Sequence, residues 1–183
     1  MTRLLTVLLA LALGTAAQAA TREAGQDSGS LQFIATQADA KFAGAFRQFH
    51  VKLDFDPARP QTGSLDVTVE TASIDTQDAE RDEILRGPDF FWVEKHPQAS
   101  FHAIRFERAG PGWSAKGELT IRGVTKTVPV EFTLTPAGGV TVMKGSARLE
   151  RLAFGLGQGD WASTEWVGNE IDVRFELRFL PVG

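Results

Sequence analysis

Residues 171–179 read Ile-Asp-Val-Arg-Phe-Glu-Leu-Arg-Phe, in which apolar and charged side chains alternate without a break. Successive side chains of a β-strand point to opposite faces, so a period of two predicts a strand with one apolar and one solvated face. Residues 65–70 and 127–134 repeat the pattern, with Val and Phe on one parity and Asp, Glu and Thr on the other. The sequence therefore predicts an all-β protein.

The same alternation extends over most of the chain, and the strands that it predicts share one apolar face. We predict eight strands, at residues 31–36, 49–55, 65–70, 99–107, 113–122, 127–134, 142–152 and 171–179. Turn residues separate them, such as Gly110-Pro111-Gly112 and Gly138-Gly139. Eight antiparallel strands can close into a barrel without exposed edges, whose interior accommodates side chains or one elongated ligand.

One segment breaks the period of two. Residues 78–86 are predicted to form a short helix between the third and fourth strands, with Asp75 or Thr76 capping its start and Gly87-Pro88 ending it. Asp89-Phe90-Phe91-Trp92-Val93 follows, and its large apolar residues are unexpected in a connection. They either close one end of the barrel core or form part of a lid over a ligand, and the two interpretations are compatible.

The N-terminus has the pattern of a secretory signal peptide. Arg3 precedes the apolar run 4–13, and Ala17-Gln18-Ala19 matches a small-residue cleavage site. We expect cleavage after Ala19 and a periplasmic or secreted protein; a retained N-terminal anchor is the alternative. The expected organisation is a signal peptide at 1–19, a flexible lead-in at 20–29 and one barrel domain at 30–183.

Composition narrows the classes of function. The formal net charge is −4 and becomes one unit more negative without the leader, which argues against nucleic-acid binding. The chain has no Cys, so the fold depends on its core without disulfides. Thirteen Phe and no Tyr suit an apolar interior and supply few acid–base groups.

Motifs that carry catalytic chemistry are missing from the sequence. His50, His96 and His102 lack the spacing of a metal site, and no Gly-x-Ser-x-Gly motif is present. Residues 155–159, Gly-Leu-Gly-Gln-Gly, do not link a strand to a helix, so we interpret them as a loop and not as a dinucleotide site. We predict no enzyme, metal or cofactor; a hydrolase or isomerase using His50 or His102 with a carboxylate is the alternative.

Four blocks of sequence resemble the YceI-like family of bacterial lipid-binding proteins. The blocks are Ser73-Ile74-Asp75-Thr76 followed by Arg81-Asp82 and Leu85; Asp89-Phe90-Phe91 followed by Pro97 and Phe101; residues 117–126 followed by Val128; and Phe154-Gly155-Leu156-Gly157. They occur in family order across nearly the whole chain after the leader. The resemblance implies a lipocalin-like antiparallel barrel that holds a polyisoprenoid or an isoprenoid quinone, in the periplasm or outside the cell.

The inward-facing parity of the strands and the apolar connection supply the residues expected around such a ligand. The predicted apolar wall and lid consist of Phe33, Phe46, Val67, Val69, Phe90, Phe91, Trp92, Phe101, Leu119, Ile121, Val130, Phe132 and Phe175. Arg47, Arg81 and Arg148 are candidates for contacts with a polar head group.

We expect a protein that sequesters or carries a long-chain polyisoprenoid. One alternative is an accessory of membrane electron transfer that presents an isoprenoid quinone to a membrane cytochrome. The other is a stress-related barrel with a solid core and no ligand. The expected partners are the lipid itself and a membrane donor or acceptor of it, and a homodimer is possible.

Overall fold

A computed structural model describes residues 21–180, which form eleven β-strands and one α-helix. The strands are β1 (Arg22–Gly25), β2 (Gly29–Gln37), β3 (Ala40–Phe46), β4 (Phe49–Asp54), β5 (Ser64–Glu70), β6 (Ile74–Asp75), β7 (Gln98–Ala109), β8 (Gly112–Ile121), β9 (Val124–Ala137), β10 (Val140–Glu150) and β11 (Glu170–Phe179). The helix α1 spans Ala79–Arg86, and short 3-10 helices occupy Pro60–Thr62, Thr71–Ser73, Arg151–Phe154 and Gly159–Ala162. The predicted leader, 1–19, lies outside the described residues.

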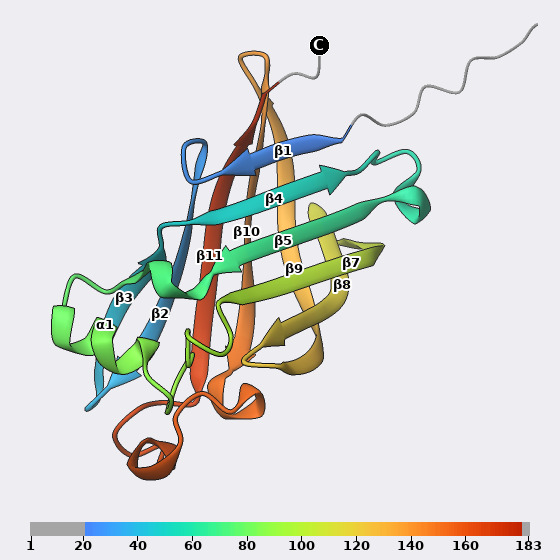
Figure 1. Ribbon diagram of the computed structural model, residues 1–183. Helices are drawn as coiled ribbons and strands as arrows, with labels where there is room; N and C mark the ends of the chain where they lie inside the picture. The colour runs from blue at the N-terminus through green and yellow to red at the C-terminus, as the bar shows by residue number, and fades with distance from the viewer. Residues whose placement is uncertain (1–20, 181–183) are drawn as a thin grey trace, which may run out of the picture.

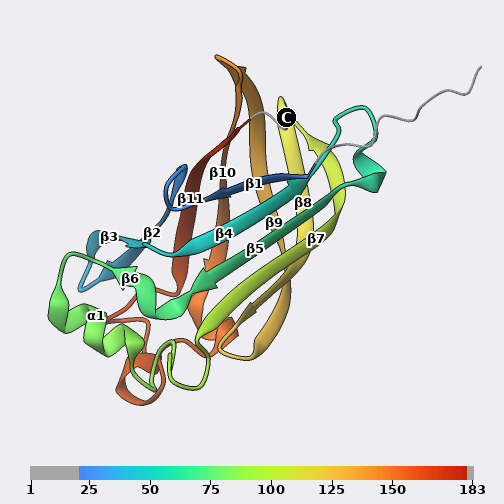
Figure 2. The ribbon, with the colours of Figure 1, turned by 45° about the horizontal axis from the view of Figure 1, so that its top comes forward.

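All eleven strands belong to one sheet, in the order β1-β4-β5-β7-β8-β9-β10-β11-β2-β3-β6, and every neighbouring pair is antiparallel. The sheet curls so strongly that β1, β4, β5 and β7 cross in front of β10 and β11 (Figure 1). A view from another direction shows the same curled wall, with α1 and the β10–β11 connection at one end (Figure 2). The result is a half-barrel whose apolar face lies inside.

The all-β prediction is confirmed, but the count of eight strands is wrong. Three strands, β1, β3 and the two-residue β6, were not predicted from the sequence. β1 lies inside the lead-in that we expected to be flexible, and it pairs with β4. In β3 the alternation is hidden because Ala and Gly hold several of its positions. Gly44 is small because a side chain at its place would overlap the ring of Phe33 on β2.

The stretch 171–179 forms β11 and lies between β10 and β2. Leu177 faces Met143 on one side and Gly29 on the other, so the last strand joins segments from the two ends of the domain. Its apolar parity points inward, as predicted, and burial increases along the strand until Phe179 is fully buried.

The predicted helix forms, with a different cap. It begins at Ala79, because the Asp78 carboxylate accepts a hydrogen bond from the backbone N–H of Arg81 (3.0 Å). Thr76 does not cap the helix; its hydroxyl donates to the buried Asp82 carboxylate (2.7 Å).

No helix within residues 21–180 is both long enough and apolar enough to cross a membrane.

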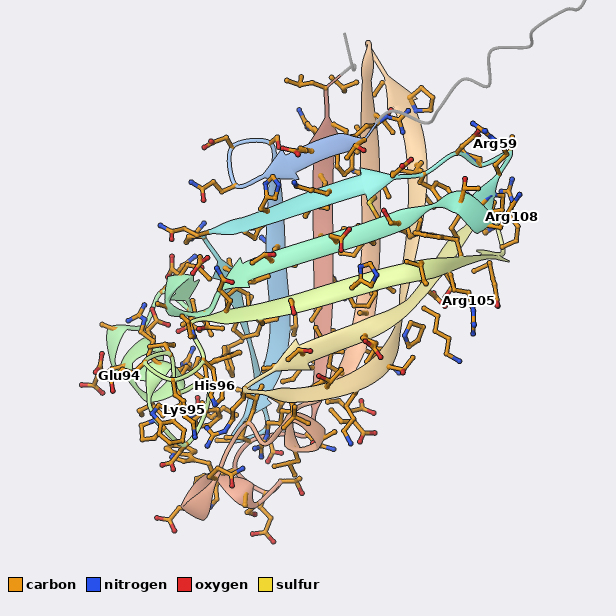
Figure 3. All side chains as sticks on the ribbon, turned by 45° about the vertical axis from the view of Figure 1, so that its right-hand side comes forward. Arg59, Glu94, Lys95, His96, Arg105 and Arg108 are labelled. Atoms are coloured by element: carbon orange, nitrogen blue, oxygen red, sulfur yellow. The ribbon has the colours of Figure 1, made fainter. Side chains whose placement is uncertain are left out.

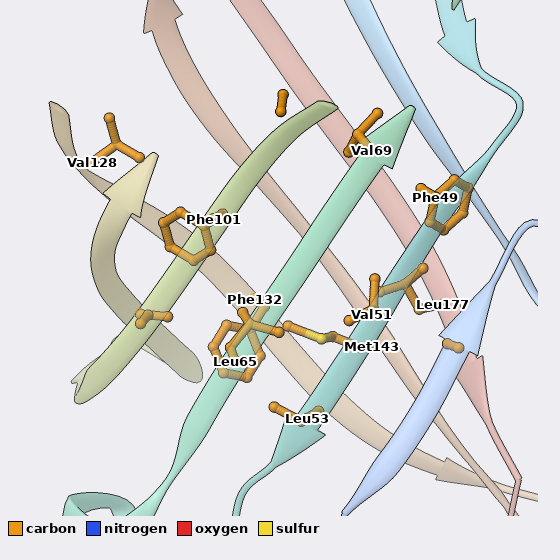
Figure 4. Packing of buried hydrophobic residues seen from close by; sticks show 14 of the residues in the cluster. Phe49, Val51, Leu53, Leu65, Val69, Phe101, Val128, Phe132, Met143 and Leu177 are labelled. Atoms are coloured by element: carbon orange, nitrogen blue, oxygen red, sulfur yellow. The ribbon is translucent and has the colours of Figure 1, made fainter. Parts of the chain in front are cut away.

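One end of the half-barrel, which we call the packed end, is filled by aromatic rings. Phe55 lies at its centre, with ring centroids 4.7 Å from Phe106, 4.9 Å from Trp113 and 5.8 Å from Phe132. Phe132 and Leu65 project into the space between the two halves of the sheet (Figure 4). Such ring pairs contribute about 0.5–1.5 kcal/mol each beyond the area that they bury.

Side chains on the outside also distinguish the two ends (Figure 3). Arg59, Arg105 and Arg108 surround the packed end, and the Arg108 guanidinium lies 4.1 Å from the centre of the Trp113 ring. Lys95 and His96 lie at the opposite end, beside α1.

Candidate functional site

The other end of the half-barrel, which we call the cavity end, encloses an apolar cavity of about 220 Å³. Thirty of its thirty-three lining residues are apolar, and the other three are Gln32, Ser100 and Arg151. The apolar lining consists of Leu31, Phe33, Ala35, Phe42, Phe46, Phe49, Val51, Leu65, Val67, Val69, Ile74, Leu85, Phe90, Phe91, Ala99, Phe101, Leu119, Ile121, Val128, Val130, Met143, Ala147, Leu149, Phe154, Leu156, Val167, Ile171, Val173, Phe175 and Leu177. Every strand except β1 contributes, so the interior is hollow here and packed only at the other end.

Eleven of the thirteen residues predicted for the wall and lid line this cavity. They are Phe33, Phe46, Val67, Val69, Phe90, Phe91, Phe101, Leu119, Ile121, Val130 and Phe175. Phe132 does not, although it has the inward parity of β9, because it packs against Phe55 and Phe106 at the packed end. The alternation along a strand predicts which face of the sheet a side chain lies on, but it does not predict where along the barrel axis the side chain lies.

Of the three residues predicted for a lid, 90–92, two line the cavity. Phe90 and Phe91 line the cavity, and the Phe91 ring packs edge-on against Phe46 (5.7 Å between centroids). Trp92 does not line it. Its φ of +46° turns the chain, and its ring lies against the Lys95 ammonium (4.4 Å) and the His96 ring (6.0 Å). The positively charged neighbours Lys95 and Arg122, the latter 5.6 Å from the ring centre, favour the face of the indole ring.

Polar contacts hold the segments that cover the cavity end. Asp82 of α1 also accepts the backbone N–H of Thr76 (2.8 Å), and Arg86 donates to the carbonyls of Ala72 (3.0 Å) and Ile74 (2.8 Å). Arg122, after β8, donates to the carbonyls of Pro88 and Phe90. These contacts hold α1 against residues 72–76 and hold the connection that carries Phe90 and Phe91 against the end of β8.

Arg151 is the one buried charged side chain among the lining residues, and the sequence interpretation missed it. Arg151 is only 3% exposed. Its guanidinium donates hydrogen bonds to the carbonyls of Leu156 (2.8 Å), Ser163 (3.1 Å), Val167 (2.8 Å) and Gly168 (3.0 Å). No carboxylate of residues 21–180 forms an ion pair with it. Burial lowers the pKa of the guanidinium, and the four carbonyls stabilise its charge.

A signal for Arg151 was present in the sequence. It has the same parity as Met143, Ala147 and Leu149, which line the cavity from β10. A charged residue on the inward parity at the end of a strand is a candidate for such a buried role. Through its four hydrogen bonds, Arg151 holds together the β10–β11 connection, residues 151–169, which covers the cavity end.

The three arginines predicted for a head group do not lie together. Arg47 and Arg148 are exposed on the outer surface, where they pair with Asp75 (2.8 Å) and Asp172 (3.4 Å), and neither lines the cavity. Arg81 pairs with Asp78 (3.2 Å) and lies over the Phe42 ring, 4.2 Å from its centre. Of the three, Arg81 alone lies next to the cavity wall.

The histidines considered for catalysis lie outside the cavity. His102 Nδ1 is 2.6 Å from the Asp66 carboxylate, but both side chains are exposed on the outer face of β5 and β7. His50 lies 3.7 Å from Glu23 on the outer face of β4 and β1. Within residues 21–180, no three His, Cys, Asp or Glu side chains are grouped so as to hold a metal ion.

The curled sheet, its cavity and the four sequence blocks agree with one known domain. The profile of the YceI-like domain matches residues 24–179, which is all of the described sheet except the first two residues of β1. The chain belongs to the YceI-like family. Two of the blocks that indicated this meet at the cavity end, where Arg122 of the third block holds the backbone of Phe90 in the second.

Relatives and solved structures support the assignment to the YceI-like family. A UPF0312 protein of Yersinia pestis is 42% identical over 95 residues, which cover 52% of this chain and 50% of that protein. The chain therefore matches about half the length of such curated relatives. The crystal structure of BcnA from Burkholderia cenocepacia is 31% identical, covers 82% of this chain and 95% of BcnA, and gives a TM-score of 0.79.

A more distant structure shares the fold of this YceI-like domain. It is a polyisoprenoid binding domain from Saccharophagus degradans, 11% identical, with a TM-score of 0.66 and coverage of 90% of this chain and 99% of that one. The curled antiparallel sheet is therefore maintained by very different sequences.

Proposed function

We propose that this YceI-like protein binds one long apolar lipid of the polyisoprenoid class in its cavity and does not act as an enzyme. The observation that carries the proposal is the cavity itself, which is lined by thirty apolar residues at one end of a barrel whose other end is packed. Concave and largely apolar sites with few polar groups are typical of sites for apolar ligands.

Burial of apolar surface supplies the binding free energy. A prenyl chain that leaves water gains roughly 25 cal/mol for each Å² that it buries. Apolar cavities of about 150 Å³ stay dry and take up small apolar molecules. This cavity is larger, and its wall includes Leu31 and Val173 from strands as well as Leu85 from α1, so a chain lying along the strands meets side chains on several sides.

The fold neighbour from Saccharophagus degradans supports the class of ligand, since that domain is a polyisoprenoid binding domain. At 11% identity the likeness concerns the fold, and the isoprenoid nature of the ligand of this chain is part of our proposal. We also propose export, with residues 1–19 removed as a signal peptide and a membrane donor or acceptor for the lipid.

Extraction of the purified protein with organic solvent, followed by mass spectrometry, tests the ligand directly. We expect one prenyl lipid per protein molecule. An isoprenoid quinone in the extract would favour the role as an electron-transfer accessory, and a protein that neither retains nor takes up any prenyl lipid would refute the proposal.

A matched pair of variants locates the site. Ala147 lines the cavity from β10, whereas Ala43 of β3 is exposed and lines none of it. Ala147→Trp is expected to fill part of the cavity and to lower the recovered lipid about tenfold, the change for a loss of about 1.4 kcal/mol. Ala43→Trp should leave it unchanged. Equal recovery from both variants would place the lipid elsewhere.

Export has its own test. When the full chain is expressed in a Gram-negative bacterium, the protein is expected in the periplasmic fraction with Ala20 as its first residue. Protein that stays in the cytoplasm and begins at Met1 would contradict export and leave the lipid site unaffected.

A further inference from the structure

A second, smaller cavity of about 170 Å³, which we call the vestibule, lies against the apolar cavity. The two have four lining residues in common, Phe42, Leu85, Phe90 and Val167, which we call the gate residues. The vestibule is also lined by Trp161, whose ring packs on Phe90 (5.7 Å between centroids), and by Ile84, which is 41% exposed. It therefore connects the wall of the apolar cavity with the surface.

The gate residues come from four separate segments, β3, α1, the α1–β7 connection and the β10–β11 connection. The backbone around them is fixed: the Asp89 carbonyl accepts from Gly157 (2.7 Å) and Gln158 (2.9 Å), and the Trp166 carbonyl accepts from Ala38 (2.8 Å). The two cavities share these four residues in their walls, and side chains change rotamer without breaking a sheet. The barrier between the cavities can thus open while the fold stays intact.

The outer part of the vestibule is polar, with Gln37, Asp78, Glu80 and Arg81. Arg81 is already paired with Asp78 and stacked on Phe42, which leaves one excess negative charge from Glu80. A phosphate or carboxylate in this space would be repelled by that charge. An uncharged group that forms hydrogen bonds, such as a hydroxyl, a ketone or an amide, meets donors and acceptors without this cost.

We infer that the vestibule is the route by which the lipid enters, with the gate residues moving aside, and that it then holds an uncharged polar end of the lipid. The inference rests on the proposed function, since it concerns the same ligand. It also explains why Arg81 lies beside the cavity with its charge already balanced by Asp78.

The missing cysteines allow a direct test of the route. Ile84→Cys, labelled with a bulky thiol reagent, places an obstacle in the vestibule; Ile104→Cys, labelled in the same way, is the matched control, because Ile104 is exposed and lines neither cavity. The association rate of retinol, an isoprenoid alcohol whose fluorescence reports binding, is expected to fall about tenfold or more for the label at 84, as when access requires a slow rearrangement. The label at 104 should leave it unchanged.

Equal rates for the two labelled proteins would overturn the route. Equilibrium binding of retinol to the unlabelled protein separates this result from a failure of the proposed function: binding with equal rates refutes the vestibule alone, whereas no binding refutes the prenyl-lipid site and the inference with it.

The polar end is tested by comparing retinol with retinoic acid, which share a chain and differ in the charge of the head. We expect retinol to bind about tenfold more tightly, because a nearby negative charge repels the carboxylate. Glu80→Lys should remove this difference, and Glu83→Lys, on the same helix but outside the vestibule, should preserve it. Retinoic acid binding as tightly as retinol to the unchanged protein would overturn the assignment of the head group.

Discussion

The two ends of the half-barrel are built from the same strands and the same residue types, yet one is solid and the other hollow. Along β11, Ile171, Val173 and Phe175 line the cavity, while Phe179 at the other end of the strand is 0% exposed. The packed end gathers three large rings, those of Phe106, Trp113 and Phe132, around Phe55. At the cavity end, small residues such as Ala99 and Ala147 share the wall, and space is left. The sum of side-chain volumes across several strands decides between the two outcomes.

The ends also differ in what holds them. The packed end relies on ring contacts, which require partners on every side. At the cavity end ring contacts such as Phe46–Phe91 lie within the wall and leave the centre open. Its covering segments are fixed by side chains that bond to backbone carbonyls, foremost Arg151 and Arg86. An end that side chains do not fill obtains its rigidity from its frame instead of its interior.

The sharpest test of this comparison removes one Phe from each end. Phe55→Ala is expected to lower the free energy of unfolding by about 3–5 kcal/mol, because it leaves a void among tightly packed rings. Phe46→Ala enlarges a space that already exists and should lower it by only about 1–2 kcal/mol. Urea unfolding of both variants measures the difference. Similar losses would show that the two ends are packed alike.

Arg151→Met tests the frame of the cavity end. The change leaves four carbonyls without their donor, two of them in buried hydrogen bonds, and should lower the free energy of unfolding by about 2–4 kcal/mol. Faster amide exchange is expected in residues 151–169 and not at the packed end. Uniform acceleration across the whole sheet would mean that Arg151 has no special connection to its own end.

Two neighbouring residues, Phe91 in the cavity wall and Trp92 outside it, provide the next test. Phe91→Ala removes a side chain from the cavity wall and should weaken retinol binding about tenfold, the equivalent of about 1.4 kcal/mol. Trp92→Ala removes an outer side chain and should leave retinol affinity unchanged. Fluorescence titration measures both. A large loss of affinity for the Trp92 variant alone would restore the predicted role of Trp92 in a lid.

The smallest expected effect is on the pH dependence of stability, through Asp75. Hydrogen bonds from the Gln77 backbone N–H and from Arg47 lower the pKa of Asp75, which lies on β6 at the edge of the cavity end. The folded state therefore favours the ionised carboxylate, and this contribution is present above the unfolded pKa of about 3.9 and is lost as pH falls through the lower folded value. Asp75→Asn should lower the melting temperature slightly at neutral pH and converge with the unchanged protein at the acid end. A difference that persists below pH of about 2 would contradict this linkage.

Much of the architecture could be predicted from alternation alone, as β11 illustrates. The strands that were missed lack that signal: β3 holds Ala and Gly where a strand usually shows larger residues, because Phe33 occupies the space above Gly44. The face of Phe132 was predictable, but its place at the packed end depends on Phe55 and Phe106 from strands far apart in the sequence. Arg151 was overlooked because its partners are backbone carbonyls, so that only the inward parity of its position marks it in the sequence.

The position of β11 in the sheet has a consequence for the time course of folding. The last strand of the domain pairs with β10 and with β2, so Leu177 meets Gly29 across nearly the whole length of the described chain. Until β11 is in place, β2, β3 and β6 have no partner in the rest of the sheet. Pairings so distant in sequence are slow to form, and domains dominated by them fold in about milliseconds to seconds. During that interval the apolar wall is open along one side, and its side chains stay in contact with water until the final strand pairs.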